Sequence, residues 1–414
     1  MKQEDKLSPE EYCDRQWTAV KDYVEGVKDG SILVGKYIKL AIKKYSQMLN
    51  DKERYAYRVE KVDKVFKFFS FLNTELKNEY IQYPLLPWQS FILSFIFGFY
   101  YADNPDKRVI REVFLFVARK NGKTNFTSAL QLYGMVGDNV ENAQSLLLAN
   151  TAQQASVALN YAKDIVTHSK ALRDRLIGQR SRIIYKNSSK QGFCQVFSSV
   201  EPARIEGTSP SMALIDEIHG WDNNGPYLAI KTGVGARVNP IIFIITTAGN
   251  KNAGFCNEYL QYHKSMLEGK INDENSIAFI YQPDPEDDIE DEAVWSKSNP
   301  SLGKIISIND LRSAYNQAAH SYSDKYAFIT KHLNLFYDTP DVWIPEEYVK
   351  PCFFKYDIDS LRGRDCYVGM DLSRNTDLTS IVLVFPPIED DKYFYVLPFF
   401  FMANRPDNIL RMLS

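Results

Sequence analysis

Cysteine and histidine are scarce in this sequence, and neither residue type is clustered. The five cysteines lie far apart with no C-x-x-C pair, and the five histidines form no H-E-x-x-H or similar group. A zinc knuckle and a disulfide framework are therefore both disfavoured, and a reducing compartment fits best. The cysteines are Cys13, Cys194, Cys256, Cys352 and Cys366.

Long hydrophobic runs and a strong net charge are also missing. The most apolar stretch, SFILSFIFGFYY (90–101), is too short to span a bilayer, and we expect it to form a buried helix. The first residues, MKQEDKLSPEEY, are polar and acidic, unlike a signal peptide. The net charge of -3 gives no overall basic signature, although a protein of this size can still carry basic patches that bind nucleic acid.

The 414 residues, 45% of them hydrophobic, allow two or three domains. Charged helices with a solvated lysine face are expected over 10–75, and contact of these lysines with DNA is the alternative. From 112 onward, short apolar runs alternate with amphipathic segments, which predicts an α/β fold with a parallel sheet covered by helices. Residues 181–200 predict an inserted hairpin, and the acidic loop PDPEDDIEDE (283–292) marks a boundary. The predicted domains are a helical segment (1–80), an α/β core (81–282), a helical linker or lid (283–345) and a β-rich unit (346–414).

The segment FLFVARKNGKTNF (114–126) predicts a phosphate-binding loop. A strand leads into a turn with Gly122, Lys123 and Thr124, and a helix follows. Glycine allows close backbone approach, lysine reaches the β- and γ-phosphates, and threonine binds Mg²⁺. Val117 stands where such loops usually have their first glycine, and Arg119 adds a positive charge inside the loop.

Two further strand ends point to the same edge of the sheet. SMALIDEI ends in Asp216 and Glu217, which we assign to Mg²⁺ binding and to deprotonation of the attacking water, respectively. IIFIITTAG ends in Thr246 and Thr247, hydroxyls that could sense the γ-phosphate. Exposed carboxylates or a threonine pair at a strand end are common on their own, but three such ends together predict ATP hydrolysis.

Three residues outside these strand ends are also candidates. Gln89 could make paired hydrogen bonds to the adenine edge, and the neighbouring Trp88 could stack on the base. Arg204, in ARIEG, could stabilise transition-state charge in a neighbouring subunit as an arginine finger. A surface salt bridge between Arg204 and Glu206 is the alternative.

Together these segments resemble the large terminase subunit of tailed bacteriophages, over nearly the whole chain. The resemblance rests on DGSILVGKYIKLAIKKY, PWQ, ARKNGKT without the first glycine, ARIEGTSPSMALIDEIHGW, TTAGN, DEAVWSKSNPSLGK and YVGMDLSRNTDLTSIVLVF. It implies an ASCE-type P-loop ATPase that uses ATP and Mg²⁺ to drive double-stranded DNA into proheads. It also implies a small terminase subunit and a portal protein as partners, a homo-oligomeric ring on the prohead, and the host cytoplasm as location without membrane attachment.

The resemblance further implies a C-terminal RNase H-like endonuclease that uses Mg²⁺ or Mn²⁺. Asp371 matches its first metal-binding aspartate and Asp377 a further acidic position, whereas Glu389, Asp390 and Asp391 are expected in a solvated turn. Only three strands of this domain are apparent, so we expect the chain to lack a complete nuclease site. The alternatives are a helicase-like nucleic-acid translocase, suggested by TAQQASVAL, and a non-catalytic assembly fragment.

Overall fold

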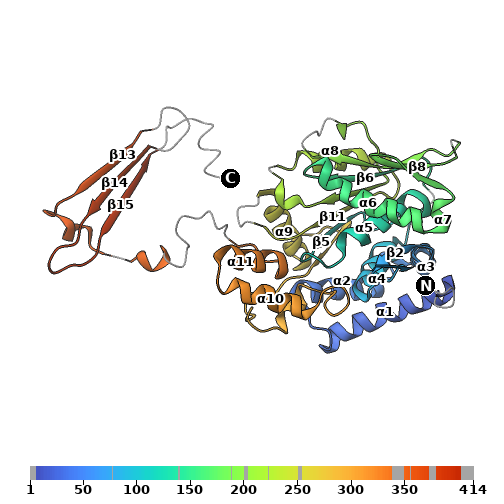
Figure 1. Ribbon diagram of the computed structural model, residues 1–414, viewed down its shortest axis with the longest axis horizontal. Helices are drawn as coiled ribbons and strands as arrows, with labels where there is room; N and C mark the ends of the chain where they lie inside the picture. Colours follow the sequence, from blue (N-terminus) through green and yellow to red (C-terminus); the bar gives the residue numbers. More distant parts are fainter. Residues whose placement is uncertain are drawn as a thin grey trace. The chain divides into compact units, whose positions relative to one another are not determined.

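The chain divides into two compact units, residues 1–343 and 344–414, in the computed structural model (Figure 1). The structure describes residues 6–76, 78–138, 140–187, 189–199, 204–221, 223–249, 254–337, 349–354, 356–372 and 379–401. The predicted boundary at 345/346 lies two residues from this division.

An eight-stranded sheet forms the centre of the first unit, in the order β12-β5-β11-β10-β6-β9-β8-β7. The first six strands in this order are parallel to one another, β8 pairs antiparallel with β9, and β7 pairs antiparallel with β8. Every residue of β5 and β11 is buried, because helices cover both faces of the sheet. The predicted helix-covered parallel sheet is confirmed. The strands are β5 (Glu112–Phe116), β6 (Ala143–Ala149), β7 (Leu176–Gly178), β8 (Arg182–Tyr185), β9 (Gly192–Ser198), β10 (Met212–Asp216), β11 (Ile241–Thr246) and β12 (Ser276–Ile280).

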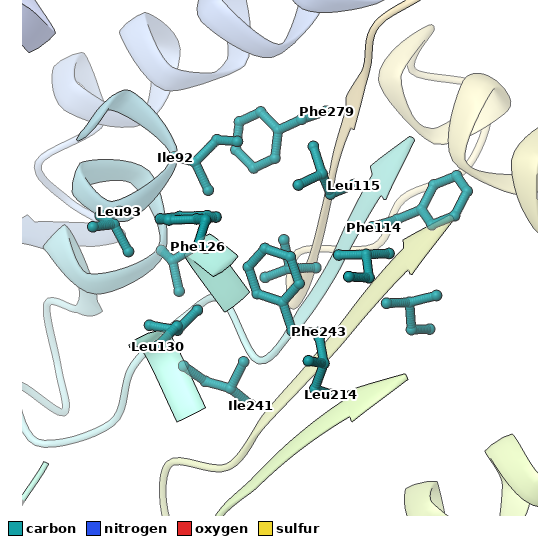
Figure 2. Packing of buried hydrophobic residues seen from close by; sticks show 14 of the residues in the cluster. Ile92, Leu93, Phe114, Leu115, Phe126, Leu130, Leu214, Ile241, Phe243 and Phe279 are labelled. Carbon is teal, nitrogen blue, oxygen red and sulfur yellow. The ribbon is translucent and has the colours of Figure 1, made fainter. Parts of the chain in front are cut away.

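Helices α4 (Pro87–Gly98) and α5 (Lys123–Leu132) pack on one face of the sheet. Figure 2 shows their side chains gathered against those of the strands: Ile92, Leu93, Phe126 and Leu130 beside Leu115, Leu214, Ile241, Phe243 and Phe279. Helix α6 (Ala152–His168) lies beside α5, over β6 and β9. On the opposite face, α9 (Gly254–Leu267) places Tyr259 edge-on to Phe114, with ring centroids 5.1 Å apart.

The apolar stretch 90–101, predicted as a buried helix, is helical only to Gly98: it forms most of α4, in which every residue after Pro87 is buried, and its last three residues form strand β4 (Phe99–Tyr101). Three amphipathic helices precede it: α1 (Pro9–Asp29), α2 (Lys36–Asn50) and α3 (Val59–Ser70). Ser8 and Glu11 form a capping box at the start of α1. Lys44 departs from the predicted solvated face, since its ammonium donates to the carbonyls of Asp273 and Ser276. The remaining short elements of this unit are β1 (Tyr55–Tyr57), β2 (Asn73–Leu76), β3 (Glu79–Gln82), β4 (Phe99–Tyr101), α7 (Lys170–Arg173) and α8 (Gly225–Gly233).

The hairpin predicted over 181–200 forms from β8 and β9, but it is not an insertion. Strand β9 pairs in parallel with β6 over seven residues, and β8 and β7 continue the sheet beyond it. The hairpin is therefore part of the main sheet. The apolar pattern of the hairpin did not indicate the pairing of β9 with β6, because a local sequence pattern does not specify which strand pairs with which.

Residues 283–337 begin with an acidic loop and build a small core of their own. In the loop, Asp284 and Asp287 hold the buried ammonium of Lys297 at 2.9 and 2.7 Å. The core contains Trp295, Ile306, Leu311, Phe328 and Leu333. Helices α10 (Ile308–Ala318) and α11 (Tyr322–Ala327) surround it.

The second unit contains three antiparallel strands, in the order β13-β14-β15: β13 (Tyr367–Asp371), β14 (Thr379–Phe385) and β15 (Tyr395–Phe401). Every residue of β13 is exposed, and so are Phe399, Phe400 and Phe401 of β15. Within the described parts of both units, no helix combines the length and the apolar character that crossing a membrane requires.

Candidate active site

The turn between β5 and α5 has the backbone geometry of an anion-binding loop. Gly122 immediately precedes α5 with φ of 78°, a left-handed conformation that favours glycine. A Cβ at this position would also lie 2.8 Å from Cδ1 of Ile305. Because the first N–H groups of a helix have no carbonyl partner within it, the start of α5 is suited to bind phosphate.

Asn121 fastens this turn to the small core of residues 283–337. Its side-chain amide donates to the carbonyl of Ala118 at 3.1 Å and to Asn299 Oδ1 at 3.0 Å. Its side-chain oxygen accepts from the backbone N–H of Ser301 at 3.1 Å, and the backbone N–H of Arg119 donates to the carbonyl of Lys331 at 2.9 Å. This contact was not predicted from the sequence, in which the segment SKSNPSLGK was the available signal.

The phosphate loop and the acidic pair meet at one edge of the sheet. Strand β11 lies between β5 and β10, and the carboxyl ends of these parallel strands carry Lys123, Glu217 and Thr246. The Lys123 ammonium is 2.9 Å from Glu217 Oε1, with the two side chains 7% and 24% exposed. Glu217 has a left-handed backbone (φ 58°), and its N–H donates to the carbonyl of Ile245.

The two carboxyl groups differ in their electrostatics. Burial opposes the ionisation of Glu217, but the charge of Lys123 and the nearby His219 outweigh burial and hold its pKa well below the usual range. Burial raises the pKa of Asp216, and the charge of Lys123 is not sufficient to offset this effect of burial. The ammonium of Lys123 is thus neutralised mainly by Glu217.

The donor set fits a magnesium ion. Asp216 Oδ1 is buried and has no hydrogen-bond partner among the described residues. Thr124 is half-buried in the first turn of α5. A carboxylate and a hydroxyl are hard oxygen donors, the type that Mg²⁺ prefers in phosphate sites. Asp216 and Thr124 would therefore hold the ion.

Thr246 and Thr247 are fully buried behind the acidic pair. His219, which was not among the predicted site residues, connects Thr246 to Glu217: its Nδ1 lies 2.8 Å from Glu217 Oε2 and 3.1 Å from Thr246 Oγ1. Its backbone N–H also donates to Thr246 Oγ1 at 3.3 Å. The Thr247 hydroxyl is buried without a hydrogen-bond partner in the described part of the chain.

The structure corrects the base-stacking role predicted for Trp88. This side chain is 1% exposed, packs between Phe126 and Tyr281, and donates its indole N–H to Ser301 Oγ at 3.1 Å. Neither ring face is accessible to a base, because the hydrophobic core takes up both.

Gln89 instead lines a pocket of about 350 Å³ that also contains Gly122, Asn125 and Ile305. The pocket lies next to the start of α5, where a nucleotide bound at the phosphate loop could extend into it. The side-chain oxygen of Gln89 already accepts the backbone N–H of Leu86 at 3.0 Å.

Of the other predicted site residues, Arg119 acts on the cluster through its charge, which partly opposes the rise in the pKa of Asp216 that burial causes. Arg119 and Arg204 are both exposed on the first unit, Arg119 inside the phosphate loop and Arg204 ahead of β10. Asp371 is exposed at the end of β13 in the second unit. Asp377 lies outside the described residues. Glu389 and Asp390 are exposed in the turn between β14 and β15, as predicted, whereas Asp391 is half-buried and lies 3.0 Å from the guanidinium of Arg364.

Comparisons with known proteins agree with this geometry. The family model "Terminase large subunit, ATPase domain" matches residues 87–265, and "Terminase large subunit, endonuclease domain" matches 270–412. Protein YmfN of Escherichia coli (strain K12) is 30% identical over 200 residues, covering 48% of this chain and 44% of YmfN. The large terminase subunit of Enterobacteria phage HK97 is 27% identical over 305 residues, covering 70% of this chain and 56% of the relative.

More of the chain aligns with a third relative, the large terminase subunit of Lactococcus phage p2, which is 24% identical over 385 residues (90% of this chain, 68% of the relative). The crystal structure of the HK97 large terminase has the same fold, with a TM-score of 0.57 and 24% identity over 85% of this chain and 70% of that one. The chain spans about half the length of the first two relatives. Since the two family models together cover most of its residues, the chain belongs to the large terminase subunit family.

Proposed function

We propose that this chain is an ATP-driven motor subunit that moves double-stranded viral DNA into proheads. The observation that carries the proposal is the meeting of Lys123, Asp216 and Glu217 at the carboxyl edge of the sheet, in a chain of the terminase family. The same family membership makes a small terminase subunit, a portal protein and a ring of identical subunits in the host cytoplasm the expected partners and setting.

Each residue of the site has a defined task in ATP hydrolysis. Lys123 and the backbone of the phosphate loop bind the β- and γ-phosphates. Glu217, ionised because of its low pKa, accepts a proton from the attacking water. When bound, Mg²⁺ neutralises phosphate charge, and Asp216 and Thr124 would hold it.

Other residues contribute through contact with the ends of the nucleotide. Arg119 and Arg204 stabilise charge on the transferred phosphoryl group, Arg204 from a neighbouring subunit. Thr246 and Thr247 sense the γ-phosphate and couple its loss to movement. Gln89, in its pocket, contacts the adenine edge.

We further propose that the second unit is part of a Mg²⁺- or Mn²⁺-dependent endonuclease in which Asp371 is a metal ligand. Two-metal hydrolysis requires several carboxylates close together, and Asp371 stands at an exposed strand end. We therefore expect this polypeptide alone to cleave DNA weakly or not at all. Efficient cleavage of plasmid DNA by the purified chain with Mg²⁺ or Mn²⁺ would contradict that expectation.

The motor proposal is tested by ATP turnover of the wild type and of Lys123→Ala. We expect measurable hydrolysis by the wild type and loss of nucleotide binding in the variant, because the γ-phosphate loses its main positive partner. Lys39→Ala, an exposed change on α2, is the matched control and should retain full activity. An inactive wild type would instead favour the non-catalytic assembly fragment, whereas an active Lys123→Ala would show that Lys123 does not bind the triphosphate.

A further inference from the structure

A basic surface lies at the end of the sheet farthest from β12. Residues 163–190 contain eight basic and two acidic residues, a local charge of +6 in a chain whose net charge is -3. All eight basic side chains except the half-buried Lys163 are exposed. We call this surface the basic edge, formed by Lys163, Lys170, Arg173, Arg175, Arg180, Arg182, Lys186 and Lys190.

The hydrogen-bonding pattern makes the basic edge continuous. Arg175 precedes the outermost strand β7, and its backbone carbonyl accepts a hydrogen bond from the backbone N–H of Lys186 at 2.8 Å. Arg180 and Arg182 flank the turn at the other end of β7, where the Lys163 ammonium donates to the carbonyl of Arg180 at 3.0 Å. The two groups of cations are separated by the length of a short strand, about 10–13 Å.

The described part of the chain offers these cations no carboxylate partner. Within the described residues, none of the eight makes an ion pair, whereas Arg54, Arg58 and Arg312 elsewhere on the surface each do. Their own contacts are with neutral groups, such as the carbonyl of Thr167 for Arg173 and the side chain of Gln179 for Arg182. Like charges kept this close together repel one another, and an external anion would relieve that repulsion.

We propose that the basic edge binds the phosphate backbone of double-stranded DNA while the motor translocates it. This inference rests on the proposed function and assigns a DNA-contacting surface to it. Charges spaced along a line suit a regular row of phosphates, which proteins contact mainly through lysine and arginine. A protein partner would be expected to bury apolar anchors, and the basic edge offers only Ile177 as an exposed large hydrophobic side chain.

The basic edge is remote from the ATP site, so the two can be tested separately. Six strand spacings separate β7 from β5, about 29 Å across the sheet. Changes at the basic edge should therefore leave ATP hydrolysis in the absence of DNA unaffected.

The experiment compares two triple variants of equal charge change in the full chain. One carries Arg175→Gln, Arg180→Gln and Arg182→Gln; the control carries Lys21→Gln, Lys28→Gln and Lys52→Gln at exposed positions on or beside α1 and α2. Binding of two unrelated 30-base-pair duplexes is measured by fluorescence anisotropy between 50 and 200 mM salt. Thermal unfolding and DNA-free ATP turnover show whether each variant is folded.

We expect the arginine variant to bind both duplexes about 10-fold or more weakly than the wild type. The slope of the logarithm of the binding constant against the logarithm of the salt concentration should decrease by the amount that corresponds to about two to three phosphate contacts. The control should behave like the wild type. If the arginine variant does not fold, Lys170→Gln, Lys186→Gln and Lys190→Gln replace its changes, with the same expectation.

Two results overturn the inference and are distinguishable from failure of the motor proposal. One is a folded, ATP-hydrolysing basic-edge variant that binds both duplexes as tightly as the control. That result would indicate that this surface binds an acidic protein and not DNA. The other is a wild type that hydrolyses ATP but binds neither duplex at 50 mM salt. A wild type without ATP turnover contradicts the motor itself.

Discussion

The ion pair between Lys123 and Glu217 leads to a specific prediction for Glu217→Gln. In the structure, the Lys123 ammonium lies 2.9 Å from Glu217 Oε1. If Lys123 binds the β- and γ-phosphates, ATP must draw the ammonium away from this carboxylate. Glutamine preserves the shape of the side chain and removes its charge, so it removes this competition. The variant should therefore bind ATP more tightly than the wild type while losing hydrolysis.

The size of the effect follows from the geometry of the pair. At 2.9 Å and an effective dielectric constant of about 20, the direct attraction is about 6 kcal/mol, most of which desolvation offsets in a pair this buried. A net contribution of about 1–2 kcal/mol would correspond to about 5- to 30-fold tighter binding of ATP. Hydrolysis should fall by about 10²- to 10⁴-fold, the usual contribution of a general base.

Titration with a fluorescent ATP analogue, together with single-turnover hydrolysis, measures both quantities. The control is Glu25→Gln, which removes an exposed carboxylate on α1 and should change neither. Weaker or unchanged ATP binding by Glu217→Gln would refute the competition between glutamate and phosphate for Lys123. Hydrolysis at the wild-type rate would refute the assignment of Glu217 as the base.

Two further predictions concern histidines of the first unit. Nδ1 of His219 contacts both Glu217 and Thr246, and the amide nitrogen of an asparagine can occupy the Nδ1 position. His219→Asn should therefore retain most of kcat, whereas His219→Gln should lower kcat about 10-fold or more with KM little changed. Equal kcat values in steady-state assays of the two variants would contradict this positioning role. Burial lowers the pKa of His263 from 6.5 to about 4, so as pH falls through this interval the unfolded chain takes up a proton that the folded chain does not, and folding stability falls by up to about 3 kcal/mol. His263→Gln should flatten this part of the pH profile in urea unfolding, and a profile as steep as that of the wild type would show that another group is responsible.

Much of the site was predictable because strand ends in a parallel sheet obey simple geometry. The apolar runs ending at Phe116, Asp216 and Thr246 were sufficient to predict β5, β10 and β11, and the rule that ligands bind at the carboxyl ends predicted that Lys123 and Glu217 would be neighbours. This inference needed no side-chain detail.

The features that the sequence analysis missed depend on tertiary packing. Trp88 and Gln89 are adjacent in the chain, yet Trp88 is enclosed by the core and Gln89 lines a pocket, a difference set by the helix face each occupies. His219 acquires its role from Thr246 on another strand. The contact of Asn121 with Asn299 joins segments 178 residues apart, and no local pattern reports it.

The attachment of the phosphate loop to residues 283–337 means that this region is no passive spacer between catalytic parts. With Arg119 bonded to Lys331 and Asn121 bonded to Asn299 and Ser301, a displacement of the loop on gaining or losing a phosphate would be passed directly to the packed cluster around Trp295. Binding or hydrolysis of the nucleotide would thereby move residues 283–337 through a few hydrogen bonds between amide and carbonyl groups.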